Sequence, residues 1–276
     1  MLFRSGRGTE CDCRKSCLLC DRGLPTSTMS RNILTGLVGA WCPSLGPSGY
    51  TLLDRSGRGQ HMSITGASSS FWGASGGSIC ARSRKGSESA STALLNSGLA
   101  ASVPWTFGCW ANIYEDLSLP VFCGFGVQLP VGAGSVGRYW LNYLSVYYLW
   151  GGANDWNTGV ALGLNAWRHV IWSYDGTTTR LHINGVQAAS TNTYTPSTQA
   201  TYSTVFNKHS SAASSVNADI NDFGIWSRAL TASEIRALYT LGIGGLGRLI
   251  TQRAQRRVFR TAQGNRRRRL ICGAEC

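Results

Sequence analysis

The segment from Trp167 to Ser190 limits what this chain can fold into more than any other. Apolar and aromatic side chains alternate with other side chains in two runs, Val170, Trp172 and Tyr174, then Leu181 and Ile183. A period of two is typical of β-strands, because successive side chains point to opposite faces of the pleat. Asp175-Gly176 separates the runs, and Asn184-Gly185 favours a two-residue hairpin turn because both residues take a positive φ. The segment therefore predicts a three-stranded β-meander.

Three segments together resemble a known family. The meander carries Trp167-x-His169-Val170 and ends in Asn184-Gly185-Val186, while Gly36-Leu37-Val38-Gly39-Ala40-Trp41 is similar to an opening strand that leads to an Asp54-Arg55-Ser56-Gly57 turn. Ile220 to Thr231 is similar to a closing strand. In order and spacing, these segments closely resemble laminin-G-like jelly-roll domains of the concanavalin A-like lectin/glucanase superfamily. The resemblance spans Gly36 to about Leu241 and implies an all-β fold, an antiparallel jelly-roll β-sandwich with a short C-terminal helix and a basic tail.

The helix after the closing strand is also visible in the residues themselves. Thr231 and Glu234 have the spacing of a capping box, in which the hydroxyl and the carboxylate each accept a backbone N–H. Ile235, Leu238 and Tyr239 form an apolar stripe at helical spacing. A short amphipathic helix is therefore expected from Thr231 onward.

The length of 276 residues leaves room for one sandwich of about 200 residues and two tails. We predict a leader over residues 1–35, a concanavalin A-like jelly-roll domain over residues 36–241 and an Arg-rich tail over residues 242–276. Only 14% of the residues are charged, against roughly 25% in an average globular chain. This composition fits a sandwich with a low-charge surface.

The net charge of +13 is concentrated near the C-terminus. Residues 36–240 contain eleven Lys and Arg against nine Asp and Glu, whereas residues 241–276 contain nine against one. The basic residues of the tail include Arg253, Arg256, Arg257, Arg266, Arg267, Arg268 and Arg269. Such a tail can neutralise nucleic-acid phosphates, dock on an acidic protein or an anionic membrane surface, or remain a solvated, disordered extension.

The leader has no hydrophobic period, and we expect it to be disordered or untranslated, with translation beginning at Met29. A zinc site is the alternative, although the spacing of its four cysteines departs from the usual paired knuckles: Cys11, Cys13, Cys17 and Cys20. The first 30 residues lack the apolar stretch of a signal peptide, and the chain has no apolar run of about 20 residues that could span a bilayer. The localisation stays unassigned, with a virion or a cell surface as the expected sites.

The ten cysteines are unevenly distributed. The predicted sandwich contains four of them, Cys42, Cys80, Cys109 and Cys123. An even spread over the chain would favour an oxidising compartment, which this distribution does not. Cys109 lies where a buried strand is expected, and we interpret it as a small apolar core residue.

The resemblance implies a calcium site. In the family, the aspartate of the Asp-x-Ser-Gly turn often helps to hold a calcium ion together with an acidic pair on the closing strand, which correspond here to Asp54, Asn221 and Asp222. Asn221 stands where the family usually has aspartate. Its amide oxygen can still bind Ca²⁺, but the loss of one negative charge weakens the site. The alternative is that Asp54 caps its own turn by accepting backbone N–H bonds.

The stretch Arg138–Trp156 is unusually aromatic. If it is one strand, Trp140, Leu144, Val146, Tyr148 and Trp150 share one face, and Tyr139, Leu141, Tyr143 and Tyr147 share the other. One set can pack in the core, which leaves the other to stack on the apolar face of a sugar. The predicted carbohydrate-binding residues are Tyr139, Tyr143, Tyr147, Asn154, Asp155 and Trp156. The alternative is that both faces are covered, by the core and by a loop or a neighbouring subunit.

Catalytic motifs are missing from the sequence. Glucanases of the superfamily use two carboxylates that flank the scissile bond, but the chain has no Glu-x-Asp-x-x-Glu pattern. The glutamates of the sandwich, Glu88, Glu115 and Glu234, fall in a loop, at a strand end and in the helix cap. The sequence also lacks a Gly-x-Ser-x-Gly elbow, a P-loop and a His-Glu-x-x-His motif. We therefore predict that the protein is not an enzyme.

Two classes of function remain. The first is a non-catalytic carbohydrate-binding (lectin-like) or adhesive module, whose partner is a glycan or a protein surface. The second is a structural assembly protein, such as a virion, capsid-associated or surface-layer component. Such a protein packs against copies of itself or against an assembly partner, and its basic tail anchors it.

Overall fold

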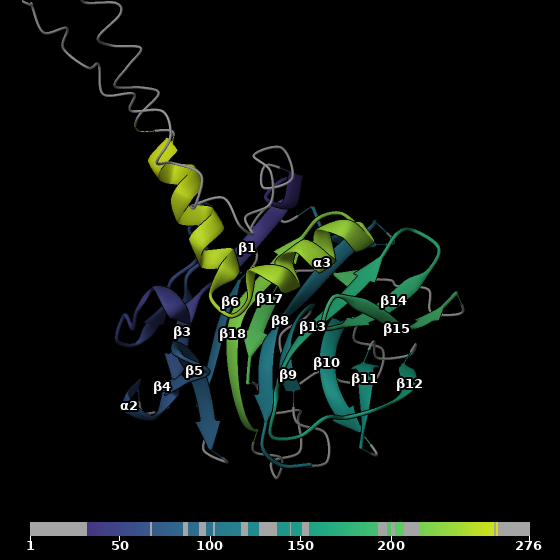
Figure 1. Cartoon of the computed structure of the whole chain (residues 1–276), viewed down its shortest axis with the longest axis horizontal. Coiled ribbons are helices and arrows are strands. Elements are labelled where there is room, and N and C mark those ends of the chain that lie inside the picture. Colours follow the sequence, from purple (N-terminus) through teal and green to yellow (C-terminus); the bar gives the residue numbers. More distant parts are fainter. Residues whose placement is uncertain are drawn as a thin grey trace, which may run out of the picture.

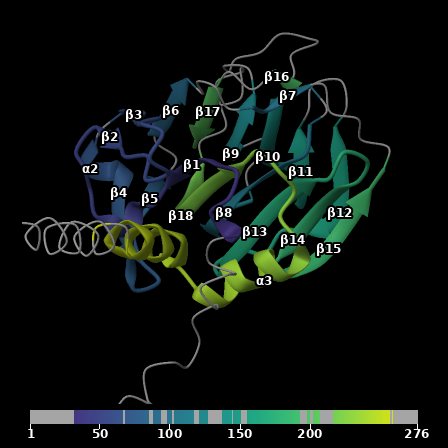
Figure 2. The ribbon, with the colours of Figure 1, turned by 90° about the horizontal axis from the view of Figure 1, so that it is seen from above.

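The computed structural model is a sandwich of two antiparallel β-sheets, and Figure 2 shows the two layers. It describes residues 32–66, 68–84, 88–93, 98–101, 103–116, 121–126, 137–143, 145–150, 155–192, 198–199, 202–206, 216–256 and 258. Within these residues each sheet has eight strands. This architecture confirms the predicted all-β jelly-roll sandwich.

Sheet A is the layer on which the C-terminal helices lie in Figure 1. Its strands are β1 (Leu37–Trp41), β4 (Trp72–Ser75), β5 (Ser78–Arg84), β8 (Trp105–Ile113), β13 (Trp167–Tyr174), β14 (Thr179–Ile183), β15 (Val186–Thr191) and β18 (Asn217–Trp226). Their spatial order is β15-β14-β13-β8-β18-β5-β4, and β1 pairs with β18. The strands at the centre of the sheet are therefore β13, β8 and β18.

Sheet B forms the opposite layer. Its strands are β2 (Thr51–Leu52), β3 (Met62–Thr65), β6 (Ser89–Ala93), β9 (Val121–Gly126), β10 (Gly137–Tyr143), β11 (Val146–Trp150), β12 (Trp156–Ala161) and β17 (Tyr202–Val205). Their spatial order is β12-β11-β10-β9-β17-β6-β3-β2. The remaining elements are the strand pair β7 (Ala100–Ala101) and β16 (Thr198–Gln199), the 3-10 helix η1 (Pro43–Leu45), and the helices α2 (Ser68–Phe71) and α3 (Ala232–Leu241).

The predicted meander is formed by β13, β14 and β15, each paired antiparallel with the next. Asn184 and Gly185 both have positive φ, 52° and 79°, which is the geometry expected of this hairpin turn. At the first turn, Oδ1 of Asp175 accepts the backbone N–H groups of Thr177 and Thr178. The three-stranded meander that was predicted from the turn residues and the period of two is therefore confirmed.

The core between the sheets is dominated by aromatic side chains. Trp105 and Phe107 of sheet A contact Phe125 of sheet B, with ring centroids 5.8 and 5.5 Å apart. Val170, Trp172 and Tyr174 of β13 belong to the same buried cluster, as their alternation predicted. Removing these large rings from water is the main source of stability for a sandwich of this kind.

The outer face of sheet A is covered as well. All nine residues of β8 are buried, and on the outer face Trp110 stacks on Tyr239 of α3 with ring centroids 5.6 Å apart. His169 and Ile171, which alternate with the core residues of β13, are 4% and 1% exposed. The centre of sheet A is therefore buried on both sides.

A bulge in β18 brings a carboxylate to this outer face. Asn221 pairs with Trp110 of β8 but Gly224 pairs with Gly108, so the register shifts between Asn221 and Gly224. Asp222 lies in the bulge with a φ of 52°. Bulges commonly re-aim a side chain, and here Oδ2 of Asp222 accepts the backbone N–H of Leu246 at 3.1 Å.

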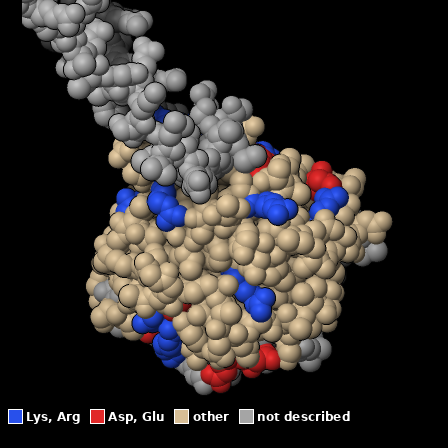
Figure 3. Space-filling view, viewed as in Figure 1, with Lys and Arg blue, Asp and Glu red and all other residues tan. Residues whose placement is uncertain are grey.

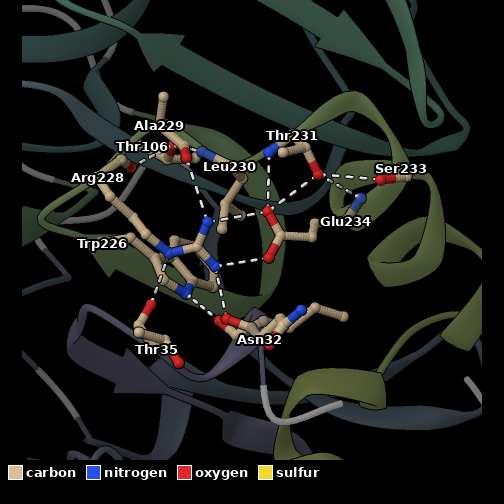
Figure 4. A network of polar contacts seen from close by, with 11 residues as sticks. Asn32, Thr35, Thr106, Trp226, Arg228, Ala229, Leu230, Thr231, Ser233 and Glu234 are labelled. Carbon is tan, nitrogen blue, oxygen red and sulfur yellow. Dashed lines mark hydrogen bonds and ion pairs between the residues drawn. The ribbon is translucent and has the colours of Figure 1, made fainter. Parts of the chain in front are cut away.

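Helix α3 begins with the predicted capping box. Oγ1 of Thr231 accepts the N–H of Glu234, and Oε2 of Glu234 accepts the N–H of Thr231 at 2.8 Å. Figure 4 shows that the same carboxylate pairs with the guanidinium of Arg228, which also donates to the carbonyl oxygens of Asn32 and Thr35. This network fastens the chain before β1 to the start of α3.

Beyond α3, the first part of a further helical segment also packs on sheet A. Residues 245–256 are helical, and Leu246 and Leu249 are each 3% exposed. They lie in an apolar cluster with residues of β1 and α3, which also contains Ile33 and Leu34 from the predicted leader. The packed structure thus extends beyond both limits of the predicted domain, residues 36 and 241. The helix then leads away from the sandwich (Figure 1).

Replacing Leu246 with alanine is expected to lower the free energy of unfolding by about 2–5 kcal/mol, because it leaves a cavity at a buried site. The matched control is Val258→Ala, which removes an aliphatic side chain that is 70% exposed and lies beyond the helix of residues 245–256. Denaturant-induced unfolding of the full chain measures both. A Leu246→Ala protein as stable as the control would show that this helix does not belong to the packed structure.

Candidate functional site

Asp54, the first predicted calcium ligand, is a turn cap. Its Oδ1 accepts the backbone N–H groups of Ala40 and Ser56 at 3.0 and 2.8 Å. Its Oδ2 accepts the N–H of Gln60 at 3.0 Å and the hydroxyl of Ser56 at 2.8 Å. Both carboxylate oxygens thus accept hydrogen bonds from the turn, and one also accepts a backbone N–H of β1, as in the alternative in which Asp54 caps its own turn.

Asn221 and Asp222 serve the backbone in the same way. Oδ1 of Asn221 accepts the N–H groups of Ser44 and Asp222, and its Nδ2 donates to the carbonyl oxygen of Ile79 at 2.8 Å. Burial raises the pKa of Asp222 to about 6, and one of its two carboxylate oxygens already accepts the backbone N–H of Leu246. Calcium takes six or more oxygens. The three residues as placed do not fit such a site, and in the described part of the chain no group of three or more His, Cys, Asp or Glu does so either. The calcium site stays a prediction.

The aromatic stretch is a hairpin and not one strand. β10 ends at Tyr143 and β11 begins at Val146, with Ser145 between them at a φ of 63°. The turn reverses which residues face the core, so Trp140 and Tyr147 point the same way. Both are fully buried, and their rings stack with centroids 5.7 Å apart. The prediction that Tyr147 binds a sugar from solvent is therefore wrong.

The outer face of sheet B carries the other aromatic set. Along β11, buried Tyr147 and Leu149 alternate with half-buried Val146, Tyr148 and Trp150. In the backbone register, Tyr139 pairs with Trp150 and Tyr143 pairs with Val146. We name the surface that carries Tyr148 and Trp150 the aromatic face.

A polar edge borders the aromatic face. The hydroxyl of Tyr148 donates to Oδ2 of exposed Asp155 at 3.1 Å. Tyr148 also pairs with Asn157 of β12, which is exposed. Trp156 points inward instead and meets Trp172 edge-on, with ring centroids 5.8 Å apart, so it anchors β12 to the core. Asn154 lies outside the described residues.

Sequence reasoning missed Tyr148 and Trp150 as surface residues. It had placed them on the face opposite to Tyr147, which is correct, but it assigned that face to the core. The turn around Ser145 contains no glycine, proline or Asn-Gly signal, so it could not be distinguished from a strand interior. A weak clue was the length of the aromatic stretch, because strands usually have about 3–10 residues.

The three glutamates of the sandwich, in which we expected no catalytic pair, have separate hydrogen-bond partners. Glu88 accepts the hydroxyl of Ser70, Glu115 accepts the side-chain amide of Asn217, and Glu234 caps α3. Each of the three thus belongs to a different part of the sandwich and has its own hydrogen-bond donor. None of these hydrogen bonds joins a glutamate to a residue of the aromatic face.

Asp219 is a buried carboxylate on the outer face of sheet A, but its partners enclose it. Arg82 and Arg84 lie 3.0 and 2.9 Å from its Oδ1, and the hydroxyl of Tyr114 donates to Oδ2 at 2.8 Å. Burial alone would raise the pKa of Asp219, but the bonds from Arg82 and Tyr114 and the charge of Arg84 lower it. This closed network holds β5, β8 and β18 together.

The basic tail is partly described. Arg253 and Arg256 are exposed on the helix of residues 245–256, and Arg257 and Arg266–Arg269 lie outside the described residues, as do residues 1–31 of the predicted leader. Figure 3 shows that this face of the sandwich is largely uncharged, with scattered Lys and Arg and a few Asp and Glu. None of the described helices is long and apolar enough to cross a membrane.

Comparison with known proteins identifies the family. The sequence matches the family model of the concanavalin A-like lectin/glucanases superfamily over residues 86–236, from β6 into α3. The chain belongs to this superfamily. No curated protein matches the sequence.

Solved structures with a similar fold have low sequence identity to this chain. The binding domain of Paraclostridial mosquitocidal protein 1 is 15% identical with a TM-score of 0.59, over 75% of this chain and 52% of that one. Trypanosoma rangeli sialidase with bound 2,3-difluorosialic acid is 16% identical with a TM-score of 0.54, over 75% and 33%. Domain 4 of AbnA, a GH43 extracellular arabinanase from Geobacillus stearothermophilus, in complex with arabinotriose, is 16% identical with a TM-score of 0.53, over 72% and 96%. The chain thus spans about half of the first protein and a third of the second. At such identities the likeness shows the fold.

His169 lies at the centre of the covered face of sheet A and gives a pH test of that burial. Its ring is 5.1 Å from that of Trp110, and burial, with a smaller effect from His182, lowers the pKa of His169 to about 3. The unfolded chain takes up this proton near pH 6.5 and the folded protein does not. The contribution of His169 to stability is therefore full above pH 6.5 and falls as the pH drops toward 3.

We expect the free energy of unfolding to fall between pH 7 and pH 5, with His169 contributing about 1.4 kcal/mol per pH unit below its unfolded pKa. His169→Gln should show a smaller fall, because His182 and Asp222 titrate in both proteins and cancel in the comparison. Denaturant unfolding at the two pH values measures this. Equal falls in the two proteins would mean that His169 is not buried in its neutral form.

Proposed function

We propose that the protein is a non-catalytic carbohydrate-binding module, lectin-like or adhesive, which takes a glycan on the aromatic face of sheet B. The observation that carries the proposal is the alternation along β11, where Tyr148 and Trp150 stay half-exposed while Tyr147 and Leu149 are buried. A large aromatic side chain that is kept at the surface of a sheet has not been used for the core.

The chemistry of the aromatic face suits a sugar. Aromatic rings offer an apolar surface that can stack on the C–H face of a pyranose or furanose, and polar groups beside them can hydrogen-bond its hydroxyls. Asp155 and Asn157 supply such groups. The bond from Tyr148 to Asp155 also limits the freedom of both side chains, which reduces the entropy lost when a ligand binds.

Sheet A is less suited to binding a ligand than the aromatic face. The centre of sheet A is covered by α3 and the helix of residues 245–256, and Asp219 is enclosed by its own partners. Glu88, Glu115 and Glu234 contact different parts of the sandwich, which favours binding over hydrolysis by a pair of these glutamates, because glycoside hydrolysis needs two carboxyl groups within about 5–9.5 Å on either side of the bond.

The structural neighbours support a binding role in two cases. One is the binding domain of a mosquitocidal protein, and the other is a domain of an arabinanase that was solved with arabinotriose. The second aligns over 96% of its length, so a unit of this fold and size holds a short saccharide in that protein. The glycan panel for this protein should include arabino-oligosaccharides and sialylated glycans.

Trp150→Ala is expected to weaken glycan binding by tenfold or more, since losing a stacking surface worth about 1.4 kcal/mol changes the dissociation constant tenfold. Tyr148→Phe, which removes only the hydroxyl bonded to Asp155, should weaken it less. The control is Tyr50→Ala, because Tyr50 is 65% exposed and precedes β2 at the far edge of sheet B. Calorimetry with the best ligand of the panel measures all three.

Two results would contradict the proposal. If Tyr50→Ala lowers affinity as much as Trp150→Ala, the aromatic face is not the site. If reducing sugar is released from the bound glycan and the release is lost in Glu115→Gln, the protein is an enzyme.

The second candidate function is assembly on an anionic partner through the C-terminal segment. Its supporting observation is that the helix of residues 245–256 leads away from the sandwich and exposes Arg253 and Arg256. Nine of the 26 Lys and Arg follow residue 240. This function is compatible with glycan binding, because the two surfaces lie on different layers.

A chain shortened after Arg256 should lose affinity for nucleic acid, because it lacks the run Arg266–Arg269 but keeps Leu246 and Leu249. For the full chain, log K should fall with log salt with a slope of about −0.7 to −0.9 per phosphate neutralised. Fluorescence anisotropy at several salt concentrations measures both. A flat salt dependence, or equal affinity of the two chains, would exclude a nucleic-acid partner for this segment.

A further inference from the structure

Two thiols meet across the middle of the sandwich. Cys109 lies on β8 of sheet A and Cys123 lies on β9 of sheet B, and both are fully buried. Their Sγ atoms are 3.7 Å apart, and Cα atoms of the two strands approach within 8 Å. An S–S bond is about 2 Å long, so forming it requires the two sulfur atoms to move closer by under about 2 Å.

We propose that Cys109 and Cys123 form a disulfide between the two sheets when the chain folds in an oxidising medium. The inference does not depend on glycan binding. It differs from the interpretation of Cys109 as a simple apolar residue, because the partner thiol comes from the opposite sheet.

The other described cysteines have different neighbours. Both Cys42 and Cys80 are buried, but Cys42 lies against the carboxylate of Asp222 and Cys80 lies near Asp219. Burial, and after it the nearby carboxylate, raises the pKa of each of these two thiols and disfavours the thiolate. These two cysteines are therefore natural internal controls, similar in burial but without a thiol in contact.

The timing of the bond follows from its burial. The thiolate is the form that attacks a disulfide, and burial, followed by the contact with Cys109, raises the pKa of Cys123 well above its ordinary value. Small oxidants also cannot reach a side chain that is fully buried. The pair is thus expected to react before the sheets close and to keep afterwards the redox state in which it was enclosed.

Oxidised glutathione is a sufficient oxidant for this step. The thiolate of one cysteine attacks its S–S bond, which forms a mixed disulfide and releases one glutathione thiolate. The thiolate of the second cysteine then attacks the protein sulfur of that mixed disulfide and releases the second glutathione. Two protein thiols are oxidised to one disulfide, and one glutathione disulfide is reduced to two thiols, which take up the two protons.

The sequence allows a direct assay on the full chain. After refolding with oxidised and reduced glutathione, free thiols are blocked with N-ethylmaleimide in denaturant and the chain is digested with trypsin. No Lys or Arg lies between residues 86 and 137, so both cysteines stay in one peptide, and glutamyl endopeptidase then cuts it after Glu115, between them. If the disulfide has formed, the two halves stay joined until reductant is added, and neither cysteine carries maleimide.

Cys80→Ala should retain the joined halves and Cys123→Ala should lose them. The oxidised wild type should also melt about 5 °C or more above the same protein refolded in reductant, because the bond closes a loop of 15 residues. This difference should vanish in Cys123→Ala. Halves that separate without reductant after oxidative refolding of the wild type would overturn the proposal. So would a disulfide that joins Cys109 to Cys42 or Cys80.

Discussion

The burial of β8 on both faces is the constraint on which the rest of the structure depends. One face meets the aromatic core of sheet B, and the other meets α3. A sheet with an apolar outer face must be covered, so the sandwich is incomplete without the two C-terminal helical segments. The bulge at Asp222, the capping box of α3 and the Arg228 network all serve to hold that cover in place. Because these helical segments cover the centre of sheet A, we propose the aromatic face of sheet B as the surface that binds a ligand.

Much of the fold could be predicted from local chemistry. The meander followed from its period of two and from Asn184-Gly185, and α3 followed from Thr231 and Glu234, because in each case the residues that set the geometry are neighbours in sequence. The position of Leu246 could not be predicted in this way. Leu246 and Leu249 are three residues apart, which is helical spacing. The surface that buries Leu246 comes from β1 and α3, however, and no local residue pattern near position 246 indicates that these elements contact it.

The candidate site shows the same limit. The turn at Ser145 divides the aromatic stretch into two strands where one was predicted, so Tyr147 was expected to face solvent but lies in the core. The calcium ligands illustrate a different difficulty. A carboxylate that accepts backbone N–H groups in a turn and one that binds a cation look alike in sequence, and the difference lies in how many donors the folded chain brings to it. Four bonds to Asp54 show which role the fold has given that residue.

We propose that the protein binds its ligand on the aromatic face of sheet B and not on sheet A. Hydrogen–deuterium exchange of the full chain with and without the tightest-binding glycan tests it most directly, because backbone amides under a bound ligand exchange more slowly. We expect added protection in the peptides of β10, β11 and β12, and no change in those of β8, β13 and α3. Protection centred on β8, β13 or α3 would contradict it.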